Sequence, residues 1–202
     1  LIAHAINAAR ESNVFDAIYV SSDDEEILDI AGNADATPYL RPAELATDTA
    51  HELDACAHVL DNLDTTISAF CVIYPTAAFI AAGDLEESRR LLDEDPPADC
   101  VMGVSSYDIH PYKAMTVDND GYCQMMFPKE CQMRSQHYPD CFASNGTFYW
   151  LRTSAFAYSR TYYQDRLKPY VMPGERAVDI DTAEDYEWAQ KLYKLLHESG
   201  DV

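Results

Sequence analysis

Two carboxylates near the end of the chain carry the clearest chemical signal in the sequence. Asp179 and Asp181 stand two residues apart, directly before an amphipathic stretch, in the segment VDIDTAEDYEWAQKLYKLL at 178–196. In a strand, this spacing sends both carboxylates to one face and Ile180 to the other. Hard oxygen ligands suit Mg²⁺ that is held jointly with phosphate groups. The spacing therefore predicts a magnesium site with Asp179 and Asp181 as ligands.

The same segment also allows a purely structural interpretation. Thr182, followed three residues later by Asp185, is a pattern that caps the start of a helix. Asp179 and Asp181 would then stand at a solvated strand end and bind nothing. The motif by itself leaves both interpretations open.

Seven motifs along the chain place this segment in a family. The first six are VSSDDEEI (20–27), YLRPAELATD (39–48), VIYPTAAF (72–79), HPYK (110–113), MRSQ (133–136) and SNGTFYW (144–150). Together with DIDTAEDY (179–186), they resemble the CMP-nonulosonate synthetases, the cytidylyltransferases that activate sialic, legionaminic and pseudaminic acids. The resemblance runs over almost the whole chain. MRSQ with FYW is more similar to the pseudaminate branch, and SNG with HPYK to the N-acetylneuraminate branch.

The resemblance implies a reaction, a cofactor and partners. CMP would pass from CTP to the anomeric hydroxyl of a nonulosonic acid, with pseudaminic acid favoured, and pyrophosphate would be released. Mg²⁺ would be the cofactor, and the enzyme would be a homodimer. The alternatives are N-acetylneuraminate or legionaminate as the sugar, a related nucleotidyltransferase acting on another sugar, or a catalytically incomplete fragment that keeps only the fold and the dimer contacts.

The beginning of the chain differs from the family pattern. The family opens with a strand and a loop rich in Gly, Ser, Lys and Arg that wraps the CTP phosphates. This chain begins without Met at LIAHAINAARESNVF (1–15), which resembles the helix after that loop. We therefore expect a chain without its phosphate cradle and, as it stands, without turnover.

The resemblance and the strand pattern assign three residues to the nucleotide side of the site. Arg41 lies in an extended segment, where a guanidinium can hydrogen-bond the cytosine edge. The alternative for Arg41 is a surface salt bridge with Glu44 or Asp48. Tyr74 and Thr76 follow a buried strand, and ligands gather beyond the carboxyl ends of such strands. The sialate enzymes more often have Gln at the position of Tyr74.

Five residues are assigned to the sugar side. Lys113 and Arg134 are scarce cations in an acidic chain, and the resemblance implies that they contact the sugar carboxylate and the phosphates. Gln136 would be a hydrogen-bonding neighbour. Asn145 would stand where the backbone approaches the sugar, and Phe148 would either line the pocket or fill the core. No spacing in the sequence identifies a general base.

Composition limits the class of protein. The chain has 202 residues and a hydrophobic fraction of 48%, which fit a single domain, 1–202. Its formal net charge of -21 argues against nucleic acid and anionic membranes as partners, because Lys and Arg provide that binding. The longest apolar run, 67–82, is too short to span a bilayer as a helix and contains Pro75.

The six cysteines form no CxxC pair, which favours reduced thiols in a cytoplasmic protein. A zinc site is the alternative, because four possible ligands share one segment. These are Cys123, Cys131, His137 and Cys141. Their spacings match none of the usual zinc motifs.

Apolar strand segments alternate with helical periodicity, which predicts an α/β fold with a mostly parallel sheet and crossover helices. The resemblance implies the Rossmann-like, three-layer fold of nucleotide-diphospho-sugar transferases. Residues 107–150 break the alternation, and the turn signal at 119–121 predicts a small antiparallel excursion with a hairpin. In the resembled family, this region contributes to the sugar site and the dimer interface.

Overall fold

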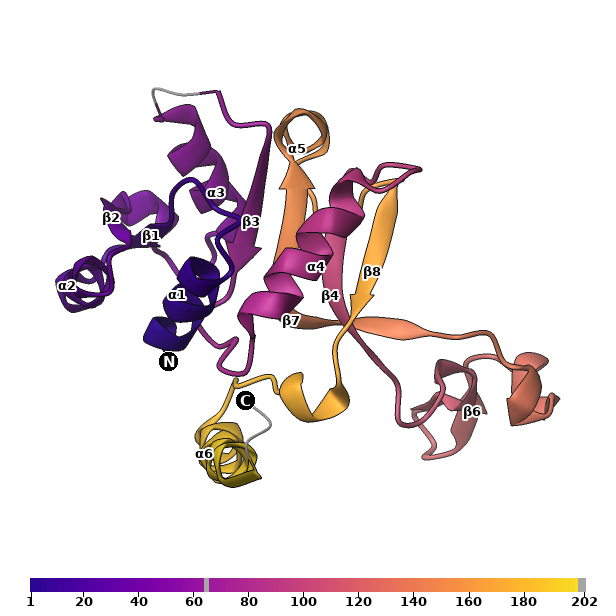
Figure 1. Cartoon of the computed structure of the whole chain (residues 1–202). Coiled ribbons are helices and arrows are strands. Elements are labelled where there is room, and N and C mark those ends of the chain that lie inside the picture. The colour runs from indigo at the N-terminus through magenta and orange to yellow at the C-terminus, as the bar shows by residue number, and fades with distance from the viewer. Residues whose placement is uncertain (64–65, 200–202) are drawn as a thin grey trace.

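The computed structural model describes residues 1–63 and 66–199, and its centre is a four-stranded sheet (Figure 1). The strands follow the order β3 (Ala69–Ile73), β7 (Phe142–Arg152), β4 (Cys100–Ser106) and β8 (Leu167–Val171). β7 runs antiparallel to both of its neighbours, whereas β8 is parallel to β4. The sheet is therefore mixed, and the prediction of a mostly parallel sheet is wrong.

The connection between β4 and β7 explains this difference. Ser106, at the end of β4, pairs with Phe142, at the start of β7. The chain between them leaves the sheet and returns beside the strand it left, without a crossover helix, so β7 has to run back along β4. The chain rejoins the sheet at Phe142 and not after residue 150, the expected end of the excursion.

A two-stranded parallel sheet forms from the first part of the chain. This part of the chain consists of α1 (Ile2–Glu11), β1 (Tyr19–Ser22), α2 (Glu25–Asn33), β2 (Thr37–Leu40) and the 3₁₀ turn η1 (Ala43–Leu45). α2 connects the two strands, as expected for a β-α-β unit. Ile6, Val20 and Ala31 form a small core between its helices and strands.

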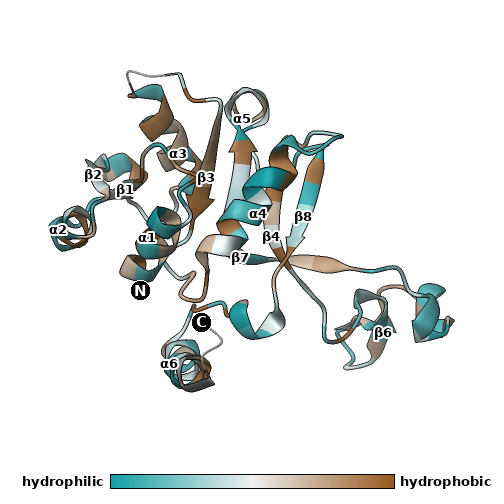
Figure 2. Cartoon of the chain, viewed as in Figure 1, coloured by the Kyte–Doolittle hydropathy of each residue, from teal (hydrophilic) through white to brown (hydrophobic). Residues whose placement is uncertain are grey.

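Helices cover both faces of the main sheet. They are α3 (Glu52–Asp61), α4 (Ala82–Asp93) and α5 (Thr153–Ser159), together with α1. Along β7, Phe148 and Trp150 pack in one core with α1 and α4, while Tyr149 and Leu151 pack in a second core with α3 and α5. This alternation has the period of two of a strand that is covered on both faces. Figure 2 shows β3 as hydrophobic along its length, consistent with its place between these layers.

The last segment of the chain packs below the sheet. β8 is followed by the 3₁₀ turn η5 (Gly174–Arg176) and by α6 (Ala183–Ser199), seen at the bottom of Figure 1. Ile180 and Ala189 pack against Phe79, which precedes α4. None of the described helices is both long enough and apolar enough to cross a membrane.

The excursion extends away from the body of the molecule (Figure 1). Its elements are η2 (Pro111–Lys113), β5 (Met115–Val117), β6 (Cys123–Met125), η3 (Glu130–Gln132) and η4 (Ser135–His137). β5 and β6 pair antiparallel, as the turn signal predicts. The Asp118 carboxylate accepts hydrogen bonds from the backbone N–H groups of Asp120 and Tyr122, and Gly121 has a φ of 87°.

Candidate active site

The segment that carries Asp179 and Asp181 has no regular secondary structure, so the predicted strand is absent. The alternation of its side chains is nevertheless present. Ile180 is 9% exposed and packs in the core with Phe79, whereas both carboxylates are exposed. Side-chain packing, with no pairing to a described strand, holds this segment in place.

The helix cap that competes with the metal interpretation also forms. The backbone N–H of Asp185 donates to the Thr182 hydroxyl at 3.2 Å, and the backbone N–H of Thr182 donates to the Asp185 carboxylate at 2.9 Å. The hydrogen bond from the Thr182 hydroxyl lowers the pKa of Asp185. The side chains of Asp179 and Asp181 make no hydrogen bond or ion pair with any described residue. Asp185 therefore serves the cap, and Asp179 and Asp181 remain available to a ligand.

Replacing Thr182 by Ala should lower stability and leave the carboxylates in place. Loss of an N-cap side chain typically costs about 1 kcal/mol, so we expect a loss of about that size in the free energy of unfolding. Urea titration monitored by circular dichroism measures it, and Thr182→Ser is the control that keeps the hydroxyl. Equal stability of Thr182→Ala and the wild type would contradict a functioning cap.

Asp179 lies against a glycine of β7. A Cβ atom placed on Gly146 would stand 3.6 Å from Oδ1 of Asp179, so the carboxylate is close to this stretch of backbone. Gly146 has a φ of 67°, in the left-handed region that favours glycine. Another residue here would be strained by this backbone conformation, and its Cβ atom would stand in van der Waals contact with Asp179. The glycine of the SNG motif therefore shapes the surface beside the carboxylate.

A bulge in β7 creates this geometry. Pairing with β4 changes register between Met102 and Val104, opposite the stretch that contains Asn145 and Thr147. A Cβ atom on Gly103 would lie 2.6 Å from Oγ1 of Thr147 and 3.0 Å from Oδ1 of Asn145. Only glycine leaves room for these two side chains. The sequence analysis missed Gly103, although an isolated glycine within a strand pattern is itself a signal of a bulge.

The side chain of Asn145 stabilises the bulge through hydrogen bonds to residues of β7 and β4. It is 9% exposed, and its Oδ1 accepts a 2.6 Å hydrogen bond from the Thr147 hydroxyl while its Nδ2 donates to Ser105. Its side chain is thus committed to neighbouring residues, and the backbone at Gly146 is what approaches Asp179. Phe148 is fully buried in the core shared with α4. Of the two alternatives for Phe148, the structure supports core packing, because none of its surface is accessible to a substrate.

Tyr74 lies beside the same bulge. Its backbone N–H donates to the Thr147 carbonyl at 2.9 Å, and its hydroxyl donates to Oε1 of Glu52 at 3.1 Å. Burial raises the pKa of Tyr74, with a smaller contribution from the charge of Glu52, so the hydroxyl is protonated at neutral pH. Thr76 follows two residues later and is partly buried. Glu52 is a further residue that the sequence analysis did not identify.

Arg41 is attached to the end of β1. Its Nε donates to the Ser21 hydroxyl at 3.2 Å, and one terminal nitrogen donates to the Ser21 carbonyl. Among the described residues it forms no ion pair with Glu44 or Asp48, the alternative partners considered above. Its other terminal nitrogen, Nη1, has no described partner. The guanidinium therefore stands at the carboxyl end of the small sheet with donor capacity left.

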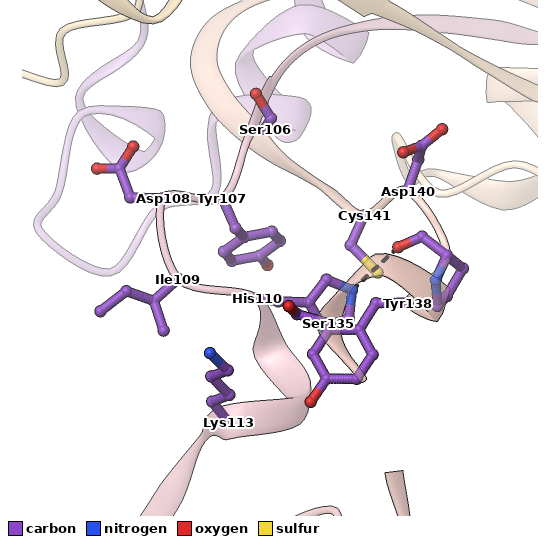
Figure 3. A pocket seen from close by; sticks show the side chains of 11 residues that line it. Ser106, Tyr107, Asp108, Ile109, His110, Lys113, Ser135, Tyr138, Asp140 and Cys141 are labelled. Carbon is purple, nitrogen blue, oxygen red and sulfur yellow. Dashed lines mark hydrogen bonds between the residues drawn. The ribbon is translucent and has the colours of Figure 1, made fainter. Parts of the chain in front are cut away.

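The cations of the excursion lie elsewhere. Lys113, Arg134 and Gln136 are exposed, and their side chains make no hydrogen bond or ion pair with described residues. Lys113 lines a cavity of about 360 Å³ where the excursion leaves the body, together with His110 and other residues of both connecting segments (Figure 3). The excursion extends away from the body of the molecule (Figure 1), and among the described residues none of these three side chains makes a hydrogen bond or ion pair with Asp179.

The zinc alternative finds no support in the geometry. Within the described parts of the chain, no three or more His, Cys, Asp or Glu side chains converge as a metal site. The four candidate zinc ligands of the excursion all lie in the described part of the chain and do not converge either. They are Cys123, Cys131, His137 and Cys141.

The candidate site therefore combines Asp179, Gly146 and Tyr74 beside the bulge of β7. Comparison with known proteins identifies the family. The sequence model described as "Cytidylyltransferase" matches residues 1–198. The chain belongs to the cytidylyltransferase family. A relative named pseudaminic acid cytidylyltransferase, from Campylobacter jejuni, is 27% identical over 99% of this chain and 88% of its own length.

Other relatives of this cytidylyltransferase carry different sugar names. CMP-N,N'-diacetyllegionaminic acid synthase of Legionella pneumophila is 25% identical over 98% of this chain and 87% of that protein. N-acylneuraminate cytidylyltransferase of Escherichia coli is 25% identical over 94% of this chain and 45% of that protein. These identities are nearly equal, so they leave the sugar open.

Solved structures agree on the fold. The structure of a CMP:2-keto-3-deoxy-manno-octonic acid synthetase complexed with CTP has a TM-score of 0.65 over 96% of this chain and 87% of that chain. The 4-diphosphocytidyl-2C-methyl-D-erythritol synthase of Anaerococcus prevotii has a TM-score of 0.67, covering 96% of this chain and 85% of that chain. Both are 13% identical in sequence, so the likeness concerns the fold alone.

Proposed function

We propose that this cytidylyltransferase transfers CMP from CTP to the anomeric hydroxyl of a nonulosonic acid, with pseudaminic acid as the favoured sugar. The anomeric hydroxyl releases its proton and its oxygen forms a bond to the α-phosphorus, the bond from that phosphorus to the bridging oxygen breaks, and pyrophosphate leaves. The observation that carries the proposal is the position of Asp179 and Asp181. Both carboxylates are exposed and unpaired among the described residues, in the segment that passes the bulge of β7 in a chain of the cytidylyltransferase family.

The donor set fits Mg²⁺. Mg²⁺ usually keeps several waters and is bound by one or two carboxylates together with substrate phosphates, so it does not need an all-protein cage. Asp179 and Asp181 supply such a pair, and the described residues contain no larger cluster of metal-ligating side chains. When bound, the ion would neutralise the charge on the phosphates of CTP. The role of the protein is to hold the two carboxylates on one side of the segment.

Arg41 and the Tyr74–Thr76 loop belong to the nucleotide side in this proposal. Nη1 of Arg41 is free to donate to the cytosine edge, while its other nitrogens are attached to Ser21. Tyr74 and Thr76 lie next to the bulge that contacts Asp179. We place the reaction in the cytoplasm, where CTP is found.

The sugar side requires a second subunit. In a chain with a formal net charge of -21, an anionic sugar needs local cations, and Lys113 and Arg134 are free to act as such. Because the excursion extends away from the body of the molecule (Figure 1), we propose a homodimer in which the excursion of one subunit brings Lys113, Arg134 and Gln136 to the site of the other. Exposed apolar side chains on the excursion suit a protein contact. They include Ile109, Met115, Val117, Tyr122 and Met126.

A pyrophosphate-release assay tests the function. The protein, preceded by the strand and phosphate-binding loop with which the family opens, is incubated with CTP, Mg²⁺ and, separately, pseudaminic, legionaminic or N-acetylneuraminic acid. We expect release that depends on a nonulosonic acid and is fastest with pseudaminic acid. No release with any of the three sugars would contradict the proposed reaction. Faster release with another sugar would overturn only the choice of sugar.

Tyr74→Phe tests the loop beside the bulge. Without its hydroxyl the ring loses the hydrogen bond to Glu52 that fixes its orientation, a loss of about 1 kcal/mol or roughly fivefold. We expect the KM for CTP to rise by about this factor, with a smaller change in the KM for the sugar acid. Tyr39→Phe is the control, because Tyr39 also hydrogen-bonds through its hydroxyl but to His58. Unchanged KM values in Tyr74→Phe would remove this residue from the site.

A further inference from the structure

Asp84, the third residue of α4, stands in a buried network that the proposed chemistry does not use. It is 3% exposed, and its two carboxylate oxygens accept hydrogen bonds from both terminal nitrogens of Arg176, at 2.5 and 2.9 Å. Tyr170 donates its hydroxyl to Asp84 at 2.9 Å, and the backbone N–H of Ala81 donates at the same distance. Four donors therefore converge on one carboxylate.

The network joins two segments that flank the candidate active site. Ala81 ends the loop that begins with Tyr74, Asp84 lies in the first turn of α4, and Arg176 precedes Asp179 by three residues. The packing of Ile180 in the core with Phe79 links the same two segments a second time. The chain from Arg176 to Ile180 is thus attached to the loop at both of its ends.

Segment 177–181 depends on such attachments because it has no backbone ladder of its own. The planar guanidinium of Arg176 makes two parallel hydrogen bonds, which define an orientation as well as a distance. A buried ion pair is weak evidence for stability, because apolar side chains of similar volume often give an equally stable fold. A role in setting a unique geometry is the better explanation for the pair of Asp84 and Arg176. Burial raises the pKa of Tyr170, with a further contribution from Asp84, so its hydroxyl remains protonated and donates.

We infer that Asp84 is a positioning residue, which acts through Arg176 to hold Asp179 in a fixed place against Gly146 and the Tyr74 loop. This inference rests on the proposed function, because it takes Asp179 as a ligand of the metal. Asp84 itself lies in the interior and touches neither metal nor substrate. Asp84 affects the reaction through the placement of the Asp179 carboxylate, which makes no hydrogen bond or ion pair with the described residues.

The test uses Asp84→Asn and Arg176→Lys in the full chain, with two readouts that need no turnover. Hydrogen exchange followed by mass spectrometry reports the backbone of 177–182, and electron paramagnetic resonance reports binding of Mn²⁺ as the probe metal. We expect faster exchange in 177–182 and Mn²⁺ binding weakened by about tenfold or more, the usual effect of losing a partner that orients a metal ligand. In turnover, kcat should fall more than the KM for CTP rises.

Asp99→Asn is the matched control, because Asp99 also accepts two hydrogen bonds from one arginine, Arg166, but stands directly before β4. It should leave both readouts unchanged, and equal effects in this control would overturn the inference. So would unchanged exchange and unchanged Mn²⁺ affinity in Asp84→Asn. If Asp84→Asn does not fold, Arg176→Lys decides by the same criteria, since it keeps the charge and removes the two-pronged geometry.

Asp179→Asn separates this inference from the proposed function. If it abolishes Mn²⁺ binding while Asp84→Asn has no effect, the metal site stands and the positioning role is wrong. If it leaves Mn²⁺ binding unchanged, the proposed metal site is wrong, and the positioning role, which takes Asp179 as its target, is wrong with it. Hydrogen exchange of 177–182 then reports only whether Arg176 anchors the segment.

Discussion

The variants Asp179→Asn and Asp181→Asn should each lose at least about 100-fold in kcat at saturating Mg²⁺ while the fold remains intact. Each change removes one of two anionic ligands, and a neutral amide compensates less of the charge on a divalent ion. Because both side chains are exposed and unpaired among the described residues, their replacement should disturb little else. Pyrophosphate release measured over a range of Mg²⁺ concentrations gives the rate, and circular dichroism gives the fold.

Glu184→Gln provides the matched control for these variants. Glu184 is an exposed acid in the first turn of α6, and its replacement changes the net charge by the same amount. We expect wild-type turnover from it. Wild-type rates in both aspartate variants at saturating metal would show that Asp179 and Asp181 are not the metal ligands.

Arg134→Ala should raise the KM for the sugar acid far more than the KM for CTP. Loss of a charged hydrogen bond to a bound carboxylate costs roughly 2 to 3 kcal/mol, which corresponds to a factor of about 30 to 150. Lys129→Ala is the control, because Lys129 is also an exposed cation of the excursion. Initial rates with each substrate varied in turn measure the two constants. A change in the CTP constant alone would assign Arg134 to the nucleotide side.

Mixing two impaired variants, assayed at a sugar concentration well below the raised KM of Arg134→Ala, tests whether Arg134 acts across subunits. In a mixed dimer of Asp179→Asn and Arg134→Ala subunits, one site has an intact Asp179 and receives Arg134 from its neighbour. Turnover should therefore rise above that of either variant alone when the two are unfolded and refolded together. Refolding each variant alone is the control. No recovery, with dimers demonstrated by sedimentation, would mean that Arg134 serves its own subunit.

Short-range patterns in the sequence were sufficient for much of the local structure. The alternation around Ile180 is observed although no strand forms there, because the apolar side chain alone seeks the core. The Thr182 cap and the hairpin turn after Asp118 also form as expected. Each depends on groups two to four residues apart, whose geometry follows from backbone and side-chain chemistry within one turn.

Relations between distant segments depended on the tertiary structure. The direction of β7 follows from its return beside β4, and periodicity alone is the same for parallel and antiparallel strands that are covered on both faces. The approach of Asp179 to Gly146 depends on the bulge opposite Gly103, and the pair of Asp84 with Arg176 joins residues 92 positions apart. Such contacts are selected by the packing of the whole core, because many pairings satisfy the same local preferences and only one arrangement buries the apolar faces together.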